Sequence, residues 1–407
     1  MSQPKVLIAG AGLGGLCLAQ GLKKAGIDFH VYERDHASDY RLQGYRIRIH
    51  SEGTDALQQC LPRDIYQLFE DTCAETRLGP GAQADPQTGE ILPPQPQQQG
   101  KGPPPMFRNA RTVDRRVLRD VLLTGLQNHV SFGKEFSHYT TNSIDSITIT
   151  FSDHTSATGT LLVGADGVHS RVRKQFLPSH VPLDTGGRII YGKTPLSPDL
   201  TATFPSAMLK GMSIIRDPDG PIPSITLLEP ITFNPPTTTT SSSDPHPHPD
   251  PVTLSTPYIY WVTTTQEIDL APLALSTSSP HTLSLSLTTH FHPTLHPLFH
   301  QQTPTLTSLL PISTHPSPLP SWPSTPTITL LGDAAHAMPP TGASGCVTAL
   351  RDAGNLVRLL EERGAKDGIE MYEEEMREYG SATIERSLEA AVKMFGFKAR
   401  EEWRNVE

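Results

Sequence analysis

The chain has 407 residues, and its 33 lysines and arginines are outnumbered by 42 aspartates and glutamates, which gives a net charge of −9. With no basic block in the sequence, this balance argues against a nucleic-acid-binding protein. No apolar run approaches the roughly 20 residues that span a bilayer, and no charged-then-apolar leader precedes the first apolar run, so we expect a cytoplasmic protein without a transmembrane segment.

Residues 6–25 have the pattern of a nucleotide-binding strand–turn–helix unit. Val6 to Ala9 predict a buried parallel strand, and residues 16–25 predict a helix. Gly10, Gly12 and Gly15 lie between them. The first permits a sharp turn, the second leaves room for a pyrophosphate, and the third lets the helix pack closely on the strand. The alternative is a tight turn that binds nothing.

A second apolar run, residues 29–32, ends at Glu33, whose carboxylate can accept hydrogen bonds from ribose hydroxyls. Arg34 follows as a candidate contact to the nucleotide, and it is equally well explained as a solvated arginine. Residues 44–50 alternate between apolar and polar, which predicts a half-exposed strand. Gly44 at its start would allow a ligand to approach the backbone.

The next segments alternate between helices and loops. Ser51 is the expected N-cap of a helix over residues 51–61. Residues 79–87 predict a loop and residues 90–92 a short strand. Residues 93–105 are rich in proline and glutamine, a composition that offers little to bury and predicts an excursion from the fold.

Residues 113–123 predict an amphipathic helix with Asp114 as its N-cap. Arg115 lies in the first turn, where the helix dipole disfavours a cation. A bound anion near Arg115 would offset this cost, and an ordinary surface salt bridge is the alternative.

Three strands are expected between residues 130 and 151, and residues 152–159 predict a polar turn. The apolar run 161–165 then ends in Asp166-Gly167. An Asp-Gly pair is often a plain turn, but the buried strand before it favours a turn on the cofactor side of the sheet.

From residue 189 to about residue 319 the pattern predicts an antiparallel sheet, in a domain inserted into the first one. Residues 234–255 are a low-complexity insert with a His-Pro repeat, for which a flexible loop is a better explanation than a metal site. Residues 283–292 predict a helix that Pro293 would stop. The expected strands are residues 189–191, 212–215, 225–228 and 258–262.

We expect no metal site and no disulfide framework. The histidines near residue 290 have no cysteine or carboxylate partners at metal-ligand spacing. The cysteines form no CxxC pair, which favours reduced, mostly structural thiols. They are Cys17, Cys60, Cys73 and Cys346.

Residues 327–331 predict a buried strand that leads to Asp333, at the end of the strand where ligands bind in open α/β sheets. A plain loop aspartate is the alternative. A loop rich in proline and glycine then leads into a helix over residues 346–362, whose first N–H groups could hold an anionic or electron-rich ring edge. The charged segment 368–407 is expected to be helical.

Together, three of these stretches resemble the single-component FAD-dependent aromatic hydroxylases, or group A flavin monooxygenases, which include the para-hydroxybenzoate and salicylate hydroxylases. Gly10-Ala-Gly-Leu-Gly-Gly15 with Glu33 is similar to their ADP-binding start. Asp166-Gly167 is similar to their DG motif, and Gly332-Asp333 to their GD motif. The resemblance runs from about residue 4 to 365, with the motifs in family order.

The resemblance implies an α/β fold with a glutathione-reductase-like Rossmann FAD-binding domain, an inserted antiparallel β-sheet substrate domain and C-terminal helices. The expected divisions are an FAD-binding domain in three parts, a substrate-side segment with the Pro/Gln-rich loop, the substrate domain, and a C-terminal helical segment. The FAD-binding domain is expected at residues 1–78, 106–175 and 320–367, and the substrate-side segment at 79–105. The substrate domain is expected at 176–319 and the C-terminal helical segment at 368–407.

In this family, Glu33 would hold the adenosine ribose, Arg115 the FAD phosphates or ribityl chain, and Asp333 a ribityl hydroxyl. Gly345 and Cys346 would offer backbone N–H groups near the pyrimidine edge of the flavin. Asp166 would serve both FAD and NAD(P)H. The full set of expected cofactor residues is Gly10, Gly12, Leu13, Gly14, Gly15, Glu33, Arg34, Gly44, Arg115, Asp166, Asp333, Gly345 and Cys346.

The sequence also departs from the family. Val347 stands where the family often has an asparagine, which removes a possible hydrogen bond near the flavin ring. Asp153-His154 stands where a glycine is usual.

The implied reaction uses NAD(P)H and dioxygen to place one oxygen atom on a small aromatic or polycyclic substrate through a flavin C4a-hydroperoxide. The sequence identifies no catalytic acid or base and leaves monomer and homodimer open. Tyr191, Tyr258, Tyr260 and Arg188 could line the pocket, but sheet packing or a solvated side chain is the better explanation for each, and we select none of them. The alternatives are an FAD-dependent dehydrogenase or oxidase, and a non-catalytic flavin-binding protein.

Overall fold

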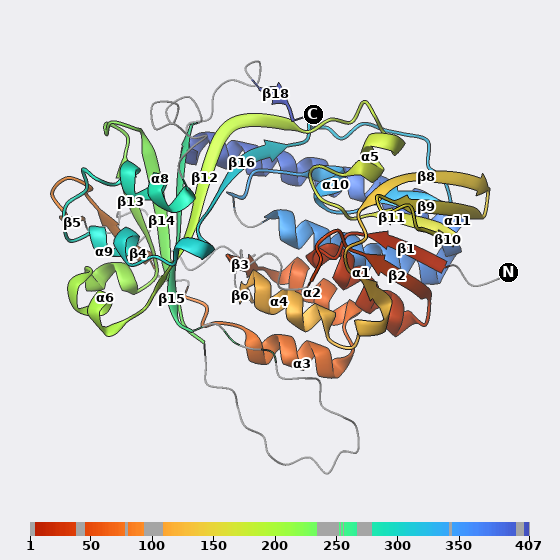
Figure 1. The fold of residues 1–407 in the computed structure, drawn as a ribbon, viewed down its shortest axis with the longest axis horizontal. Helices are drawn as coiled ribbons and strands as arrows, with labels where there is room; N and C mark the ends of the chain where they lie inside the picture. Colours follow the sequence, from red (N-terminus) through yellow and green to blue (C-terminus); the bar gives the residue numbers. More distant parts are fainter. Residues whose placement is uncertain are drawn as a thin grey trace, which may run out of the picture.

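The computed structural model describes residues 5–37, 45–77, 80–92, 109–233, 256–266, 279–341, 344–395 and 403–406, together with Val252 and Leu254. Its two largest sheets, one parallel and one mostly antiparallel, occupy the right and left of the molecule in Figure 1. Among the described helices, none is both long enough and apolar enough to cross a membrane.

The parallel sheet has five strands in the order β17-β11-β1-β2-β7, and every neighbouring pair is parallel. Its three central strands are largely buried runs of apolar residues, as expected for strands covered on both faces. The strands predicted at residues 6–9, 29–32 and 161–165 are confirmed. The strands are β1 (Lys5–Ala9), β2 (Asp28–Tyr32), β7 (Val130–Ser131), β11 (Leu161–Gly164) and β17 (Ile328–Leu330).

Helices pack on this sheet because parallel strands need crossover connections. The first, α1, begins at Leu13, three residues earlier than predicted, so the glycine motif runs into its first turn. Asp114 is the N-cap of α4, as predicted, and its side chain accepts from the Arg116 N–H at 2.9 Å. The helices are α1 (Leu13–Ala25), α2 (Ser51–Cys60), α3 (Arg63–Thr72), α4 (Arg115–Leu123), α5 (Arg171–Phe176) and α10 (Asp333–His336).

The last helix, α11 (Ser344–Phe395), is interrupted at Gly364, which has a φ of 71°. After this break the chain turns back on itself, which brings Glu375 within 3.1 Å of Arg358 on the first half of the helix. The second half of α11 then packs across the parallel sheet, where the Tyr372 hydroxyl donates to the Leu330 carbonyl of β17 at 2.9 Å. The predicted C-terminal helix is thus confirmed up to residue 395.

The larger sheet has eight strands, in the order β16-β12-β15-β14-β13-β4-β5 with β18 beside β12. Helices α6 (Pro198–Thr203), α8 (Pro280–Leu287) and α9 (His296–His300) pack on one face over a core that includes Trp261 and Phe299. The strands are β4 (Pro80–Ala84), β5 (Ile91–Leu92), β12 (Leu183–Pro195), β13 (Met212–Asp217), β14 (Ser224–Ile231), β15 (Tyr258–Gln266), β16 (Ser308–Thr314) and β18 (Arg404–Asn405).

The opposite face of this sheet carries a buried cluster of tyrosines: Tyr191, Tyr258 and Tyr260. Tyr45, just before β3, stacks on Tyr191 with ring centroids 4.7 Å apart. The cluster therefore lies where the antiparallel sheet meets the segment that carries Arg46 and Arg48.

Two small antiparallel sheets and three 3-10 helices complete the described fold. One sheet pairs β3 (Arg46–Ile49) with β6 (Arg111–Asp114), and the other joins β8 (Phe136–Ser143), β9 (Ser146–Phe151) and β10 (Ser156–Gly159). The 3-10 helices are Gln127–His129, Ser206–Leu209 and Pro304–Leu306.

The loop predicted over residues 79–87 is wrong for residues 80–84, which form strand β4 and pair in parallel with β13. Its glycines and proline favour a loop locally, but at Gly81 only a glycine fits. A Cβ there would lie 1.9 Å from the Met212 carbonyl oxygen. The missing side chain lets β4 approach β13 closely. These two strands form a parallel pair in a sheet whose other pairs are antiparallel.

Four other local predictions need correction. Residues 152–159 are not only a turn, since β10 pairs with β9. The helix expected over 283–292 ends at Leu287, well before Pro293, where Thr288 and Thr289 bond back to carbonyls of the helix. The strand near residue 46 is mostly buried because it packs between layers, and the N-cap of α2 is His50, not Ser51.

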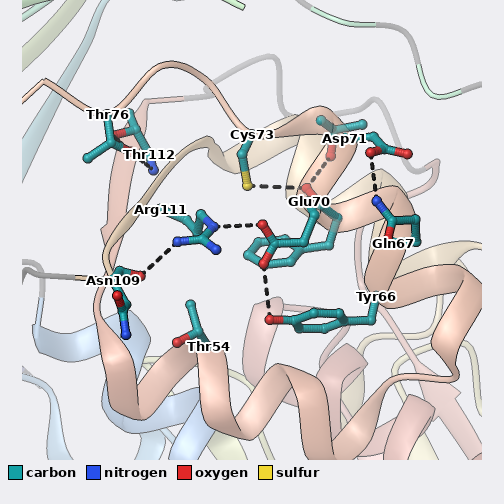
Figure 2. Close-up of polar contacts among 12 residues, drawn as sticks. Thr54, Tyr66, Gln67, Glu70, Asp71, Cys73, Thr76, Asn109, Arg111 and Thr112 are labelled. Carbon is teal, nitrogen blue, oxygen red and sulfur yellow. Dashed lines mark hydrogen bonds and ion pairs between the residues drawn. The ribbon is translucent and has the colours of Figure 1, made fainter. Parts of the chain in front are cut away.

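A polar network ties α3 to β6 (Figure 2). Arg111 donates to the Glu70 carboxylate at 2.7 Å, and the Tyr66 hydroxyl donates to the same carboxylate at 3.0 Å. Next to them, burial raises the pKa of the Cys73 thiol to about 12, and all four cysteines are free. The network fixes the start of the strand that leads to Asp114 and Arg115.

Candidate functional site

The parallel sheet places four distant segments at one edge. In the strand register Ala9 pairs with both Tyr32 and Gly164, and Gly164 pairs with Leu330. The residues that follow these strand ends are Gly10, Glu33, Asp166 and Asp333. The carboxyl edge of such a sheet is where open α/β folds bind ligands.

The turn after β1 needs its glycines for two different reasons. Gly10 has a φ of 111°, and a Cβ on it would lie 2.4 Å from the Ala165 carbonyl oxygen. A Cβ on Gly15 would lie 2.2 Å from the Gly10 carbonyl oxygen. At Gly12, by contrast, a Cβ would meet no atom within 4 Å. Gly10 and Gly15 are therefore required by the fold, whereas Gly12 leaves open space in front of the loop.

Glu33 fixes the backbone around this space. Its carboxylate accepts from the Ala11 N–H at 2.7 Å and from the Asp35 N–H at 3.0 Å. Only 8% of Glu33 is exposed. Arg34, next along the chain, is exposed and also belongs to the lining of the cavity described below.

A cavity of about 520 Å³ opens between the glycine turn and the start of α4. Its lining carries more cations than carboxylates, although the whole chain has a net charge of −9. An excess of cations around a cavity favours an anionic ligand. The cations are Arg34, Arg115, Arg116, Arg119, Lys134, Arg171 and Lys174, and the carboxylates are Glu33, Asp35, Glu135 and Asp166.

Arg119 is a residue of this site that the sequence analysis missed. From α4 its Nε donates to the Ala11 carbonyl oxygen at 3.0 Å. The backbone of Ala11 is therefore held at two points, by Glu33 at its N–H and by Arg119 at its carbonyl. Burial lowers the pKa of the Arg119 guanidinium, and the Glu33 carboxylate acts in the opposite direction. Its position one turn after Arg115 on the same helix could have indicated a residue that lines the cavity, although not its contact with the Ala11 carbonyl.

Asp333 and the start of α11 lie beside Arg115. A Cβ on Gly345 would be 3.8 Å from an Asp333 carboxylate oxygen. The Asp333 side chain contacts solvent, yet surrounding protein raises its pKa by desolvation, while the charges of His336 and Arg115 lower it. Burial raises the pKa of the Cys346 thiol to about 12, and Arg115 acts against that rise.

The DG motif has a structural partner of its own. The Asp166 carboxylate accepts from the Ser170 hydroxyl, from the Arg171 N–H at 2.8 Å and from the Val172 N–H at 3.3 Å. Burial raises its pKa, and these hydrogen bonds lower it. Asp166 therefore caps the start of α5 while also lining the cavity.

The expected site residues thus fall into three groups. Gly10, Gly12, Glu33, Arg34, Arg115 and Asp166 line one cavity. Asp333, Gly345 and Cys346 lie next to Arg115 at its side. Leu13, Gly14 and Gly15 are buried in the first turn of α1, and Gly44 lies outside the described residues.

Both departures from the family pattern have a local explanation. Val347 is buried, and its methyl groups lie against Gly53, so this position is an apolar contact between α11 and α2. His154 has a φ of 65°, the left-handed conformation in which a glycine is usual. Asp153 supports that turn by accepting from the Thr155 N–H at 3.0 Å.

Comparison with known proteins agrees with this geometry. The FAD binding domain family matches residues 325–387. The chain is 37% identical over 416 residues to the dual O-methyltransferase/FAD-dependent monooxygenase CTB3 of Cercospora beticola. This alignment covers 97% of this chain and 46% of CTB3. It is 36% identical over 181 residues to the FAD-dependent monooxygenase dbaB of Emericella nidulans, covering 42% of each. The chain spans about half the length of the curated relatives it matches.

Solved structures give the same fold. A protein of Photorhabdus luminescens subsp. laumondii TTO1, described as an FAD containing monooxygenase, superposes with a TM-score of 0.75 and 30% identity, over 96% of this chain and all of that one. Klebsiella pneumoniae HpxO, complexed with FAD and uric acid, superposes with a TM-score of 0.68 at 20% identity, over 96% of this chain and 88% of that one. The glycine turn, the DG and GD motifs, the fold and these relatives agree, and the chain belongs to the family of FAD-dependent monooxygenases.

Proposed function

We propose that this chain is a monooxygenase that uses FAD, NAD(P)H and dioxygen to insert one oxygen atom into a small aromatic or polycyclic substrate. The observation that carries the proposal is the convergence of the glycine turn, Glu33, Arg115 and Asp333 on one edge of the parallel sheet. When bound, FAD supplies the electron transfer and the activation of dioxygen.

The residues present fit FAD. Gly12 leaves the space that a pyrophosphate needs, and the N-terminus of α1 faces this space. Arg115 also lines the cavity, and its positive charge, which the dipole of α4 disfavours, is available to the phosphates or the ribityl chain. Glu33 would accept hydrogen bonds from the adenosine ribose with the lone pairs not used by Ala11 and Asp35. Asp333 would accept from a ribityl hydroxyl.

At the other end, the N–H groups of Gly345 and Cys346 would hold the pyrimidine edge of the flavin ring. The tyrosine cluster lies on the antiparallel sheet beyond Tyr45, whose ring lies 5.6 Å from the Arg115 guanidinium. Buried aromatic side chains in that position supply an apolar environment that keeps water away from the reacting oxygen. Asp166 keeps its place at the start of α5 and lines the cavity that FAD and NAD(P)H approach.

The substrate proposed here carries ring hydroxyl groups. Three relatives that cover at least 97% of this chain are named as dual O-methyltransferases and FAD-dependent monooxygenases. An O-methyltransferase needs a hydroxyl group on its acceptor, so a hydroxylated aromatic is the chemistry that the two activities share. The cytoplasmic location and the monomeric or homodimeric state stay predictions.

Isotope-labelled dioxygen tests the proposal. The FAD-loaded protein is given NADPH, ¹⁸O₂ and a panel of hydroxylated naphthalenes and larger polycyclic phenols, with NADPH oxidation and product mass as readouts. We expect at least one phenol to accelerate NADPH oxidation and to gain one ¹⁸O atom. Product formation without label indicates the dehydrogenase or oxidase alternative, and a protein that takes up no FAD contradicts the proposal outright.

Arg119 gives a second test, because it holds the Ala11 carbonyl and does not belong to the family motifs quoted above. Replacing it with methionine keeps the aliphatic stem and removes both the Nε donor and a positive charge at the cavity. We expect FAD to bind at least roughly tenfold more weakly, because the lost hydrogen bond alone is worth about 1–1.5 kcal/mol and the lost charge adds to it, measured by quenching of flavin fluorescence. Arg363→Met on the exposed surface is the control. Unchanged affinity in Arg119→Met would show that the carbonyl contact has no role in FAD binding.

A further inference from the structure

A buried carboxylate, Asp352 of α11, lies behind the GD turn. Both Asp352 and its neighbour His336 have 0% exposure. One Asp352 oxygen accepts from the Gly332 N–H at 2.8 Å and lies 2.7 Å from His336 Nε2. The other accepts from the Tyr379 hydroxyl at 2.6 Å. One side chain therefore joins the end of β17, helix α10 and both halves of α11.

These contacts fix both ends of the short segment that carries Asp333. Gly332 has a φ of 65° and a ψ of −140°, a conformation that glycine adopts and other residues avoid. Its N–H is held by Asp352, and His336, four residues later, is held by the same oxygen. Asp333 lies between these two anchors, so its direction depends on the Asp352 carboxylate.

The cluster also sets the charge around Asp333. A carboxylate without solvent contact needs a counter-charge, and His336 supplies it. Burial alone would lower the pKa of His336, but the charges of Asp352 and Asp333 raise it above its ordinary value. Tyr379 and Arg351, whose guanidinium lies 4.0 Å from the Tyr379 ring, face the cluster from α11.

The other groups around His336 do not replace its charge. His180 and His315 stack on each other at 4.3 Å, and burial lowers the pKa of both, with Arg173 acting in the same direction. Both are therefore neutral near neutral pH. Arg115 faces Asp333 from the cofactor side, so His336 is the counter-charge on the buried side.

We propose that Asp352 and His336 are positioning residues for the cofactor, which aim Asp333 at the ribityl chain of FAD and keep its carboxylate ionised. The inference rests on the proposed contact between Asp333 and FAD, and it is independent of oxygen transfer. Tyr379 completes the unit by holding the second Asp352 oxygen.

Equilibrium binding of FAD to the apoprotein tests the proposal, with flavin fluorescence read at about pH 6 and about pH 8. His336→Gln keeps a donor for Asp352 but removes the charge that lowers the pKa of Asp333, so Asp333 takes up a proton at higher pH. We expect this variant to bind FAD about tenfold more weakly at the lower pH than at the higher one. The wild-type protein should bind equally well or more tightly at the lower pH.

Tyr379→Phe keeps the ring and removes one hydrogen bond to Asp352, and it provides a second test if His336→Gln does not fold. We expect FAD to bind roughly threefold to tenfold more weakly. Tyr372→Phe is the matched control, since Tyr372 lies on the same half of α11 and donates to a β17 carbonyl instead. Its affinity for FAD should equal that of the wild type.

Two results would overturn the inference. One is a loss of affinity in His336→Gln that is the same at both pH values, as a purely structural contact predicts. The other is wild-type affinity in Tyr379→Phe. Neither readout requires a substrate, so a failure to incorporate oxygen from ¹⁸O₂ leaves this test fully interpretable.

Discussion

Replacing Gly12 by valine is expected to remove most of the affinity for FAD and to leave the unliganded fold intact. Gly12 has a φ of −73° and a ψ of 176°, which any residue adopts, and a Cβ there meets no atom within 4 Å. The valine methyl groups would instead fill the space in front of the loop. Losing charge-assisted hydrogen bonds of about 1.5–3 kcal/mol to the pyrophosphate predicts a roughly 10- to 100-fold weaker complex.

The measurement is the dissociation constant of FAD together with the melting temperature of the apoprotein. Gly15→Ala is the informative control, because its Cβ would lie 2.2 Å from the Gly10 carbonyl oxygen. That variant should lower the melting temperature of the apoprotein itself. If Gly12→Val binds FAD like the wild type, the pyrophosphate does not cross this loop.

Replacing Glu229 by alanine is expected to destabilise the folded protein by about 3–5 kcal/mol, because it leaves buried charges without a partner. Glu229 of β14 is almost fully buried, and its two carboxylate oxygens pair with Arg46 and Arg48 of β3. The side chains of these arginines are only 10% and 6% exposed. The three residues join the antiparallel sheet to the part of the chain that precedes α2.

Urea unfolding of the apoprotein measures this effect. Glu375→Ala provides the comparison, since Glu375 pairs with Arg358 on the surface with side chains 40% and 36% exposed. A surface pair of this kind contributes about 0–1 kcal/mol. A triple replacement of Glu229, Arg46 and Arg48 by methionine should recover much of the loss. Equal effects of the two alanine substitutions would show that the buried cluster is not stabilised by Glu229.

The first strand and its glycine turn could be predicted because local chemistry decides them. Val6 to Ala9 are a short continuous apolar run, which is typical of a strand buried on both faces. Gly10 adopts a φ that few other residues tolerate. Asp114 was predictable for the same reason, as a short acceptor at the start of an amphipathic helix. In each case the residues and their spacing carry the structural information.

Strand β4 and the contact of Arg119 could not be predicted, because both depend on distant backbone. The segment around Gly81 becomes a strand only beside β13, more than 120 residues later in the chain. Arg119 resembles any polar residue on a helix, and the Ala11 carbonyl that it meets lies in another element. The contact of Asp352 with Tyr379 likewise requires α11 to reverse at Gly364, which a continuous helical pattern does not reveal.

The reversal of α11 makes the carboxyl-terminal arm a working part of the nucleotide fold. After the bend at Gly364, this arm covers β17 and contributes the hydroxyl of Tyr379 to the carboxylate behind the GD turn. Truncating the protein or inserting another domain before residue 379 would therefore loosen the turn at Gly332, some 45 residues earlier in the chain.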